Sequence, residues 1–541
     1  MLVLTTLSAR RTELMAHLHQ QRIEDIPLCI SPDDTSFLQI KIASIEQEIA
    51  SLISQISQLE SQVQLKRQDL AAMNNVLAPI RRLPFELLSS IFQEFCLLDQ
   101  STRCASRRSV KAQITLSQVC FTWRKVALGT PRFWREIDVN LRRASSNSMR
   151  EIQMVPSWLK RSGALSLDVS MVLHRRNYQS SIDVFNQLLP FCDRIRSLTL
   201  TLSLPCLSSF LSKQPKLCVL EKLDLTLHPD VTTPKHHNDT LKPHQHHQGF
   251  SRILNLHQLW SVKLKLPRST YHDNQKSFLT QVMFTLPLPL NQLHSLHLEL
   301  NQDGNYSFSD ACSYLNILRN CLPTLVHCRL VRCPEHLRDA LVKFPGPMTF
   351  SSLEFLSFEQ WDDAEEARLV QLITVPALVT LRIDHSIFGG DDFTDFSKHL
   401  IEMEARSSFP LSTLELIRAR MMCTRDLLAV LVAFSTVKHL KLCDCNLNTE
   451  LLMRGLQICG SQTQGRKPIV PRLEWLYLVD HEVIPKGSEY SIVDMVESRT
   501  NKVLDTGVCF RRLTLAYECH QLSEVVTRLD ELVDLDLKAI E

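Results

Sequence analysis

The stretch Val437-Lys-His-Leu-Lys-Leu-Cys-Asp-Cys-Asn-Leu447 carries the pattern that decides the fold. Leu440 and Leu442 are separated by the polar Lys441, and residues two apart in an extended strand point to the same face. Cys445 and Asn446 then follow as a turn. The spacing LxxLxL therefore predicts a short strand with one buried face, followed by a turn.

The same spacing, with other apolar residues in place of some leucines, recurs through most of the chain. Twelve full motifs begin at Ile195, Leu220, Leu259, Leu293, Leu325, Leu353, Leu378, Leu411, Val437, Leu473, Phe510 and Leu532. A partial motif, 164–169, precedes them, and apolar patterns with helical spacing lie between motifs, as at 184–189 and 426–432. One strand and one helix in each unit predict an array of stacked repeats.

This array resembles a degenerate leucine-rich repeat, and the resemblance covers residues 165–541. It implies an α/β solenoid shaped as a horseshoe, with parallel strands on its concave face. Residues between the core leucines would face outward there, and those we single out as target-binding are Lys263, Lys265, Arg382, Lys441, Trp475 and Tyr477. The alternatives are buried strands of an ordinary α/β enzyme and, for the two aromatic residues, packing against a neighbouring repeat.

Residues 38–78 place apolar side chains at alternating intervals of four and three, without Gly or Pro. With Ile42 at heptad position a, Lys66 is the one polar residue at position d. The pattern predicts a coiled-coil helix, and Ile at a with some Leu at d favours a parallel homodimer. Packing of this helix against its own chain is the alternative. Residues 1–37 are expected to be a poorly ordered lead-in.

Residues 79–134 contain two further helical patterns. The first, PIRRLPFELLSSIF at 79–92, starts with a proline, which suits the first turn of a helix. The second, ITLSQVCFTWRKVA at 114–127, is followed by TPRFW at 130–134. Each pattern has more apolar residues than one buried face requires, and such a surplus indicates a surface for a partner.

This segment resembles the F-box, whose pattern runs from LPxELLxxIF to a VCxxWRxxA helix and a terminal aromatic, and it is especially similar to F-box proteins numerous in fungi. F-boxes bind the Skp-type adaptor of cullin-RING ubiquitin ligases. The matching adaptor-binding positions are Leu83, Pro84, Glu86, Leu87, Ile91, Phe92, Leu116, Val119, Cys120 and Trp123. One departure is the insertion 99–113, which holds four basic residues where the family has a short apolar turn.

Composition excludes several other functions. The 541 residues include only 12 glycines, with no GxGxxG and no GxxxxGK[ST], which argues against nucleotide enzymes of the Rossmann or P-loop type. Lys and Arg number 60 against 58 Asp and Glu, so the net charge of +2 gives no reason to expect nucleic-acid binding. Without HExxH or GxSxG, we expect no catalytic residue, metal or cofactor, and we interpret the histidine-rich segment 229–249 as a polar loop.

The 17 cysteines lack paired spacing, which fits reduced thiols in the cytoplasm or nucleus. No apolar run reaches the roughly 18 residues of a membrane span. We interpret residues 135–164 as a connector between the two segments. The two resemblances together imply a non-catalytic substrate receptor of an SCF-type ubiquitin ligase. The F-box would bind the Skp-type adaptor and through it a cullin, and the solenoid would bind an unknown target protein. A scaffold outside any ligase is the alternative.

Overall fold

The chain divides into two compact units, residues 1–107 and 108–541, and each is described by itself. The structure, a computed structural model, describes residues 9, 12, 16, 32–102, 112–141, 146–173, 178–228, 256–266, 282, 286–301, 306–334, 336–343, 346–361, 363–385, 396–420, 422–458, 468–479, 488–500, 510–517 and 523–539. The histidine-rich segment 229–249 and most of the insertion 99–113 lie outside these residues, as does most of the lead-in.

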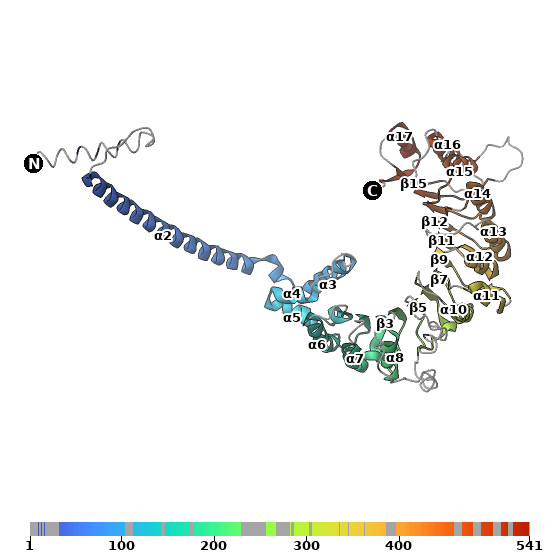
Figure 1. The fold of residues 1–541 in the computed structure, drawn as a ribbon, viewed down its shortest axis with the longest axis horizontal. Helices are drawn as coiled ribbons and strands as arrows, with labels where there is room; N and C mark the ends of the chain where they lie inside the picture. The colour runs from blue at the N-terminus through green and yellow to red at the C-terminus, as the bar shows by residue number, and fades with distance from the viewer. Residues whose placement is uncertain are drawn as a thin grey trace, which may run out of the picture. The chain divides into compact units, whose positions relative to one another are not determined.

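The first unit is helical. Helix α2 runs unbroken from Pro32 to Leu77 (Figure 1), which confirms the helix predicted from the heptads and starts it at Pro32, within the predicted lead-in. The short helix η2 (Pro79–Arg82) and helix α3 (Phe85–Thr102) follow it. The heptad side chains of α2 stay about half exposed, as with Ile49 at 50% and Ile56 at 55%. They therefore form an apolar stripe on the surface of the helix.

The second unit begins with α4 (Ala112–Val119), α5 (Phe121–Gly129) and the short helix η3 (Pro131–Trp134). Trp134 joins these helices to the sheet that follows. Its indole nitrogen donates a hydrogen bond of 2.9 Å to the carbonyl of Ala127. Its ring lies 6.4 Å from that of Trp158 on α6 (Ser146–Arg161), and both rings are buried. The aromatic residue that ends the predicted helical segment thus packs in the core.

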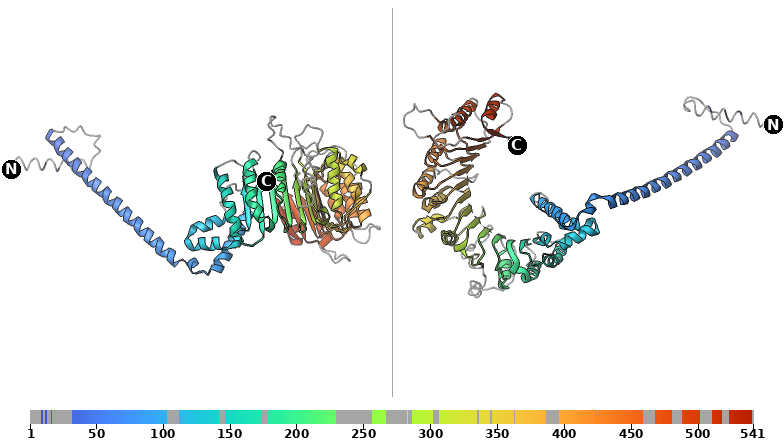
Figure 2. Two further views of the ribbon diagram at one scale, coloured as in Figure 1. Left: turned by 90° about the horizontal axis from the view of Figure 1, so that it is seen from below. Right: turned by 180° about the vertical axis from the view of Figure 1, so that it is seen from behind.

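Fourteen strands form one parallel sheet in which each strand pairs with its neighbours in chain order (Figures 1 and 2). The strands are β1 (Glu136–Asn140), β2 (Leu167–Val172), β3 (Ile195–Ser203), β4 (Lys222–His228), β5 (Ser261–Lys265), β6 (Ser295–Glu299), β7 (His327–Val331), β9 (Phe355–Trp361), β11 (Thr380–His385), β12 (Thr413–Ile417), β13 (His439–Cys443), β14 (Trp475–Val479), β15 (Arg512–Tyr517) and β16 (Asp534–Ala539). A separate two-stranded sheet pairs β8 (Met348–Thr349) with β10 (Ile373–Thr374).

All twelve LxxLxL motifs form strands, β3 to β16, and the partial motif forms β2. Equivalent motif positions pair across the sheet, so that Leu198 is opposite Leu223, and Leu440 lies between Leu414 and Leu476. These leucines are at most 5% exposed. Burial of the same motif position in successive strands fixes the register, because a one-residue slip would turn each leucine to the other face.

Helices cover one face of the sheet, which is the outer face of its curve in Figure 1. After α6 they are α7 (Tyr178–Leu188), α8 (Leu204–Ser212), α10 (Phe308–Asn320), α11 (Leu337–Lys343), α12 (Asp363–Leu372), α13 (Phe396–Ser407), α14 (Thr424–Ala433), α15 (Thr449–Leu456), α16 (Ser488–Thr500) and α17 (Ser523–Leu532), with the short helices η4 (Leu189–Arg194) and η6 (Leu290–Gln292). The core between them and the sheet is made of the motif leucines and apolar helix residues. The coarse prediction of an α/β fold with parallel strands is therefore correct.

The prediction of a connector at 135–164 is wrong, because these residues form the first strand of the sheet and the first helix that covers it. Strand β1 pairs with β2 along its whole length, and α6 packs against β1. Strand β1 buries only Ile137 and Val139, and the apolar residue three positions before Ile137 is Trp134, which belongs to the predicted helical segment 79–134. Two apolar residues are too weak a signal to be recognised as a strand.

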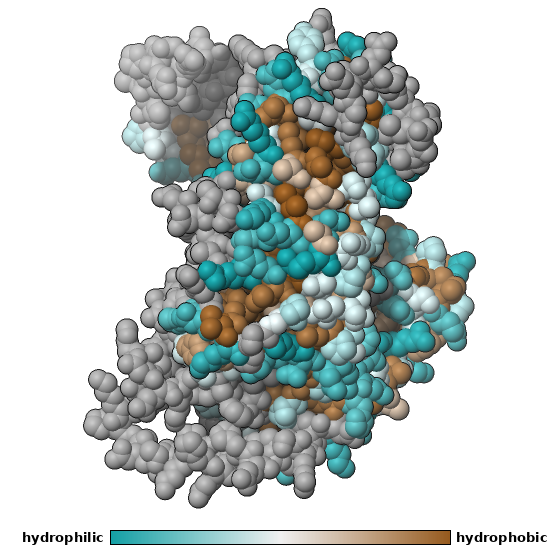
Figure 3. Space-filling view, turned by 90° about the vertical axis from the view of Figure 1, so that its right-hand side faces the viewer, coloured by the Kyte–Doolittle hydropathy of each residue, from teal (hydrophilic) through white to brown (hydrophobic). Residues whose placement is uncertain are grey.

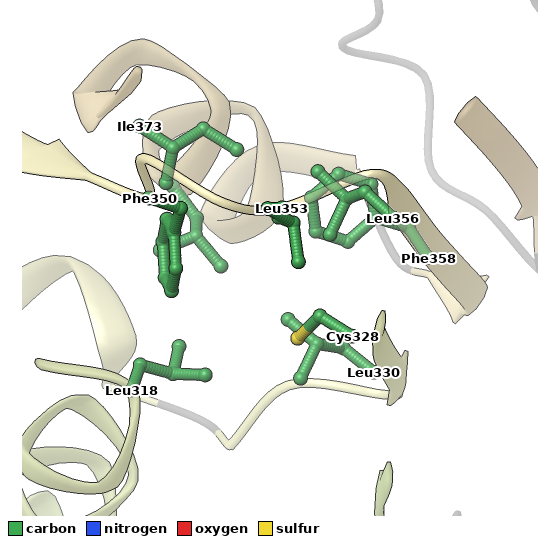
Figure 4. Close-up of a pocket in the computed structure, with 9 residues that line it drawn as sticks. Leu318, Cys328, Leu330, Phe350, Leu353, Leu356, Phe358 and Ile373 are labelled. Atoms are coloured by element: carbon green, nitrogen blue, oxygen red, sulfur yellow. The ribbon is translucent and has the colours of Figure 1, made fainter. Parts of the chain in front are cut away.

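A small cavity lies in the core between β7, β9, β10 and α10 (Figure 4). Its volume is about 10 Å³, and it is lined by Leu318, Cys328, Leu330, Phe350, Leu353, Leu356, Phe358, Leu369 and Ile373. The lining offers one thiol and no side-chain oxygen or nitrogen. A space of this size with no hydrogen-bond partner does not hold an ordered water molecule. The cavity is a packing gap and not a ligand site.

Candidate binding surfaces

Helix α3 separates its apolar residues onto two sides. Leu88 and Phe92 are 2% and 1% exposed, whereas Leu87, Ile91 and Phe95 are 52%, 48% and 47% exposed. The three exposed residues are four apart and therefore lie on one face of the helix. They give α3 a continuous apolar row in contact with solvent.

The predicted adaptor-binding residues between 83 and 92 differ in how far they are exposed to solvent. Pro84, Glu86, Leu87 and Ile91 are exposed, and Leu83 is half-buried. Phe92 is buried, so its predicted contact with a partner is replaced by a role in packing. Phe95 belongs to the exposed row although the matched pattern does not include it. Its spacing of four from Ile91 was the signal that could have found it.

Helices α4 and α5 expose a second apolar surface. Val119 and Phe121 are 58% and 76% exposed, and Trp123 is half-buried. Leu116, predicted to bind the adaptor, is 6% exposed and packs in the core. Cys120 has a structural role as the N-cap of α5, since its Sγ accepts a hydrogen bond of 3.5 Å from the backbone nitrogen of Trp123.

The face of the sheet opposite the helices is polar, and its charges pair across neighbouring strands. Lys263 Nζ on β5 lies 3.6 Å from Asp224 Oδ2 on β4, and Lys265 pairs with Glu299 on β6. Burial raises the pKa of Asp224 and outweighs the opposing effect of Lys263. Burial, with Arg329 and Lys263 nearby, lowers the pKa of His297 to about 4, so this histidine is neutral at neutral pH.

Among the described residues, Glu359 on β9 is at the centre of the largest ion-pair network on this face. Its Oε2 lies 2.5 Å from Arg329 Nη2, and its Oε1 accepts a hydrogen bond of 2.9 Å from Ser357 Oγ. Arg382 lies between two carboxylates, 3.5 Å from Glu359 and 3.2 Å from Glu415. Burial alone would raise the pKa of Glu359, but the bonds from Arg329 and Ser357 outweigh it and the pKa is lowered.

Aromatic side chains gather on strands β13 and β14. The Trp475 ring lies 6.0 Å from His439 and 6.0 Å from Tyr477, and its indole nitrogen donates a hydrogen bond of 3.3 Å to Thr514. Lys441 Nζ lies 5.0 Å from the centre of the Tyr477 ring. The rings of Trp475 and Tyr477 are half-buried. These residues support one another and still present aromatic surface.

The six predicted target-binding residues all lie on this polar face, because they occupy the positions between motif leucines. The structure brings Lys441, Trp475 and Tyr477 into one cluster, while Lys263 and Lys265 lie several strands away on β5. Sequence reasoning missed Glu359, whose two arginine partners come from motifs on either side of its own.

The helix-covered side offers no comparable surface among the described residues. Single exposed apolar residues occur there, such as Val342 and Val432. Figure 3 shows the hydrophobic residues on this side in patches that hydrophilic residues separate. Scattered apolar residues of this kind are normal on a protein surface.

Within the described part of the chain, no group of three or more His, Cys, Asp and Glu side chains is arranged to hold a metal ion. None of the described helices has both the length and the apolar character needed to span a bilayer. Comparison of the chain with protein-family models and with curated proteins found no match.

Proposed function

We propose that this protein is a non-catalytic substrate receptor of an SCF-type ubiquitin ligase, with an F-box that binds a Skp-type adaptor and thereby a cullin. The observation that supports it most is the apolar row Leu87, Ile91 and Phe95, which is half exposed on the helix that carries the LPxELLxxIF pattern. Exposed apolar rows on short helices are typical of surfaces that bind a partner. Val119 and Phe121 add a second such surface, on the segment that carries VCxxWR.

We further propose that residues 136–539 form a leucine-rich repeat solenoid that holds the target protein. The support is the order of the parallel strands, which follows the chain, together with motif leucines that are buried in register. The polar face would contact the target, with Lys441, Trp475 and Tyr477 as the main contacts because aromatic residues dominate the energetics of interfaces. Lys263 and Lys265 on β5 and Arg382 on β11 would contribute charge elsewhere on this face.

In this proposal the protein accelerates ubiquitin transfer without a reacting group of its own. It would bind the adaptor and the target at the same time, so that the target's lysines meet the activated ubiquitin at a raised effective concentration. The gain would come from positioning, and neither cofactor nor metal would be needed.

Capture of a purified Skp-type adaptor by the full chain tests the proposal. The double variant Leu87→Ala and Ile91→Ala should reduce adaptor binding by about ten- to a hundredfold, because each side chain is half exposed and its covering contributes about half of the roughly 1.5–3 kcal/mol of full burial. Gln93→Ala is the matched control, since this exposed α3 residue lies on the opposite side of the helix from the apolar row. Failure of the folded wild-type protein to bind any Skp-type adaptor would refute the ligase role and favour the scaffold.

A further inference from the structure

The apolar stripe of α2 follows a coiled-coil heptad pattern from Leu38 to Leu77 and is interrupted by one charged residue, Lys66. Ile45 is the least exposed of its described a and d residues from 42 onward, at 47%, and Met73 and Leu77 are the most exposed apolar ones, at 64%. The full set at a is Ile42, Ile49, Ile56, Val63, Leu70 and Leu77, and at d it is Leu38, Ile45, Leu52, Leu59, Lys66 and Met73. A stripe of this length with a period of 3.5 residues matches only another helix with the same period.

We propose that the partner of this seam is a second copy of the same chain, aligned parallel and in register. Three of the first four a positions are Ile and the fourth is Val, while Leu52 and Leu59 occupy successive d positions. β-Branched residues at a with Leu at d favour a two-stranded parallel coiled coil. A second copy also provides a stripe of identical length, which covers the whole seam.

The charged residues that flank the seam are compatible with this alignment. In a parallel pair, each g residue faces the e residue five positions further along the other helix. Lys41 then faces Glu46 of the second copy, which is an attractive pair. The other facing pairs contain no two like charges, and they are Glu48 with Ile53, Gln55 with Glu60, Gln62 with Arg67 and Asp69 with Asn74.

Lys66 makes the alignment testable because it is the single charged residue in the seam. A parallel pair in register places Lys66 opposite Lys66 of the second copy, whereas an antiparallel pair places it opposite an apolar a residue. The Lys66 ammonium lies 3.6 Å from Asp69 Oδ2 on its own helix, and the side chain is 85% exposed. Its long aliphatic stem can therefore carry the charge out of the seam, so a parallel dimer tolerates the two facing Lys66 side chains.

Sedimentation of the full chain tests the pairing. The wild type should sediment at twice 62.1 kDa. Ile56→Asp, which places a charge in the seam, should weaken the dimer by at least about a hundredfold. Ser54→Asp adds the same charge at outward position f and should leave the dimer unchanged. A wild-type monomer at high micromolar concentration, or equal effects of the two variants, would overturn the proposal.

Mixing experiments test the alignment. When differently tagged wild-type and Lys66→Glu chains are combined, a parallel pair in register should form mixed dimers roughly fivefold above the statistical ratio, because Lys faces Glu only in the mixed species. Lys66→Gln mixed with wild type is the control and should stay near the statistical ratio. A statistical ratio for Lys66→Glu as well would refute the parallel alignment.

Discussion

Replacing Glu359 by Gln tests whether the ion pairs of the polar face stabilise the sheet. The substitution keeps the shape of the side chain and removes its charge, which leaves Arg329 and Arg382 without the carboxylate between them. Loss of one member of a buried ion pair costs about 3–5 kcal/mol. Because Arg329 and Arg382 are 47% and 31% exposed, water compensates part of this loss. We therefore expect a decrease of about 1–3 kcal/mol in the free energy of unfolding.

Urea denaturation followed by tryptophan fluorescence measures this change. Glu354→Gln is the matched control, since Glu354 is an exposed carboxylate in the same repeat, and it should change stability by less than about 0.5 kcal/mol. A double-mutant cycle with Arg329→Gln should give a coupling energy of about 1 kcal/mol between the two residues. Equal effects of Glu359→Gln and Glu354→Gln would refute the reasoning.

The same variant makes a prediction about pH. The pKa of Glu359 is lowered in the folded protein from its ordinary value of 4.5. A lowered folded-state pKa stabilises the protein above the unfolded pKa, and this stabilisation is lost as the pH falls through the folded value. The stability difference between wild type and Glu359→Gln should therefore be full at pH 7 and shrink below about pH 4.5. A difference that stays constant down to the acid transition would contradict the ion-pair explanation.

Three further predictions concern stability. Arg499, which is 2% exposed, donates hydrogen bonds to the carbonyls of Leu456, Val470 and Ile469, so Arg499→Lys should cost about 3 kcal/mol and lower the melting temperature. Gln360 has a φ of 55°, so Gln360→Gly should be neutral or stabilising in urea while Gln360→Val costs about 1–2 kcal/mol. The pKa of His297 is lowered from 6.5 to about 4, so its stabilising effect is present above pH 6.5 and is lost toward pH 4. His297→Gln should flatten the stability profile over that range.

The strands could be predicted from sequence because the burial signal is local. Leu440 and Leu442 are two residues apart, so one motif defines a buried face without knowledge of any neighbour. The repetition of the motif then predicts which strands are adjacent. Strand β1 was not predicted because Trp134, the apolar residue three positions before Ile137, was assigned to the preceding helical segment, which left only Ile137 and Val139 as a signal.

The binding surfaces were predictable only in part, because sequence shows which residues are apolar and not which of them are covered. Ile91 and Phe92 are adjacent in the same pattern, yet one is 48% exposed and the other 1%. Glu359 and Arg329 are 30 residues apart, and their contact depends on the register of β7 and β9. Such a pair cannot be recognised before the strands are aligned.

The geometry of the polar face also determines which of its residues can contribute most to binding a target. Arg382 already contacts Glu359 and Glu415, so a partner carboxylate that recruits it must first replace contacts of comparable strength. The exchange gives little net binding energy, because the ion pair that Arg382 loses within the chain is comparable in strength to the one it gains with the partner. Covering the half-exposed rings of Trp475 and Tyr477 would instead remove apolar surface from water, which does not require the loss of an ion pair. If this face binds a target as proposed, its charges would set where the partner is accepted, and the aromatic residues of β14 would set how tightly it is held.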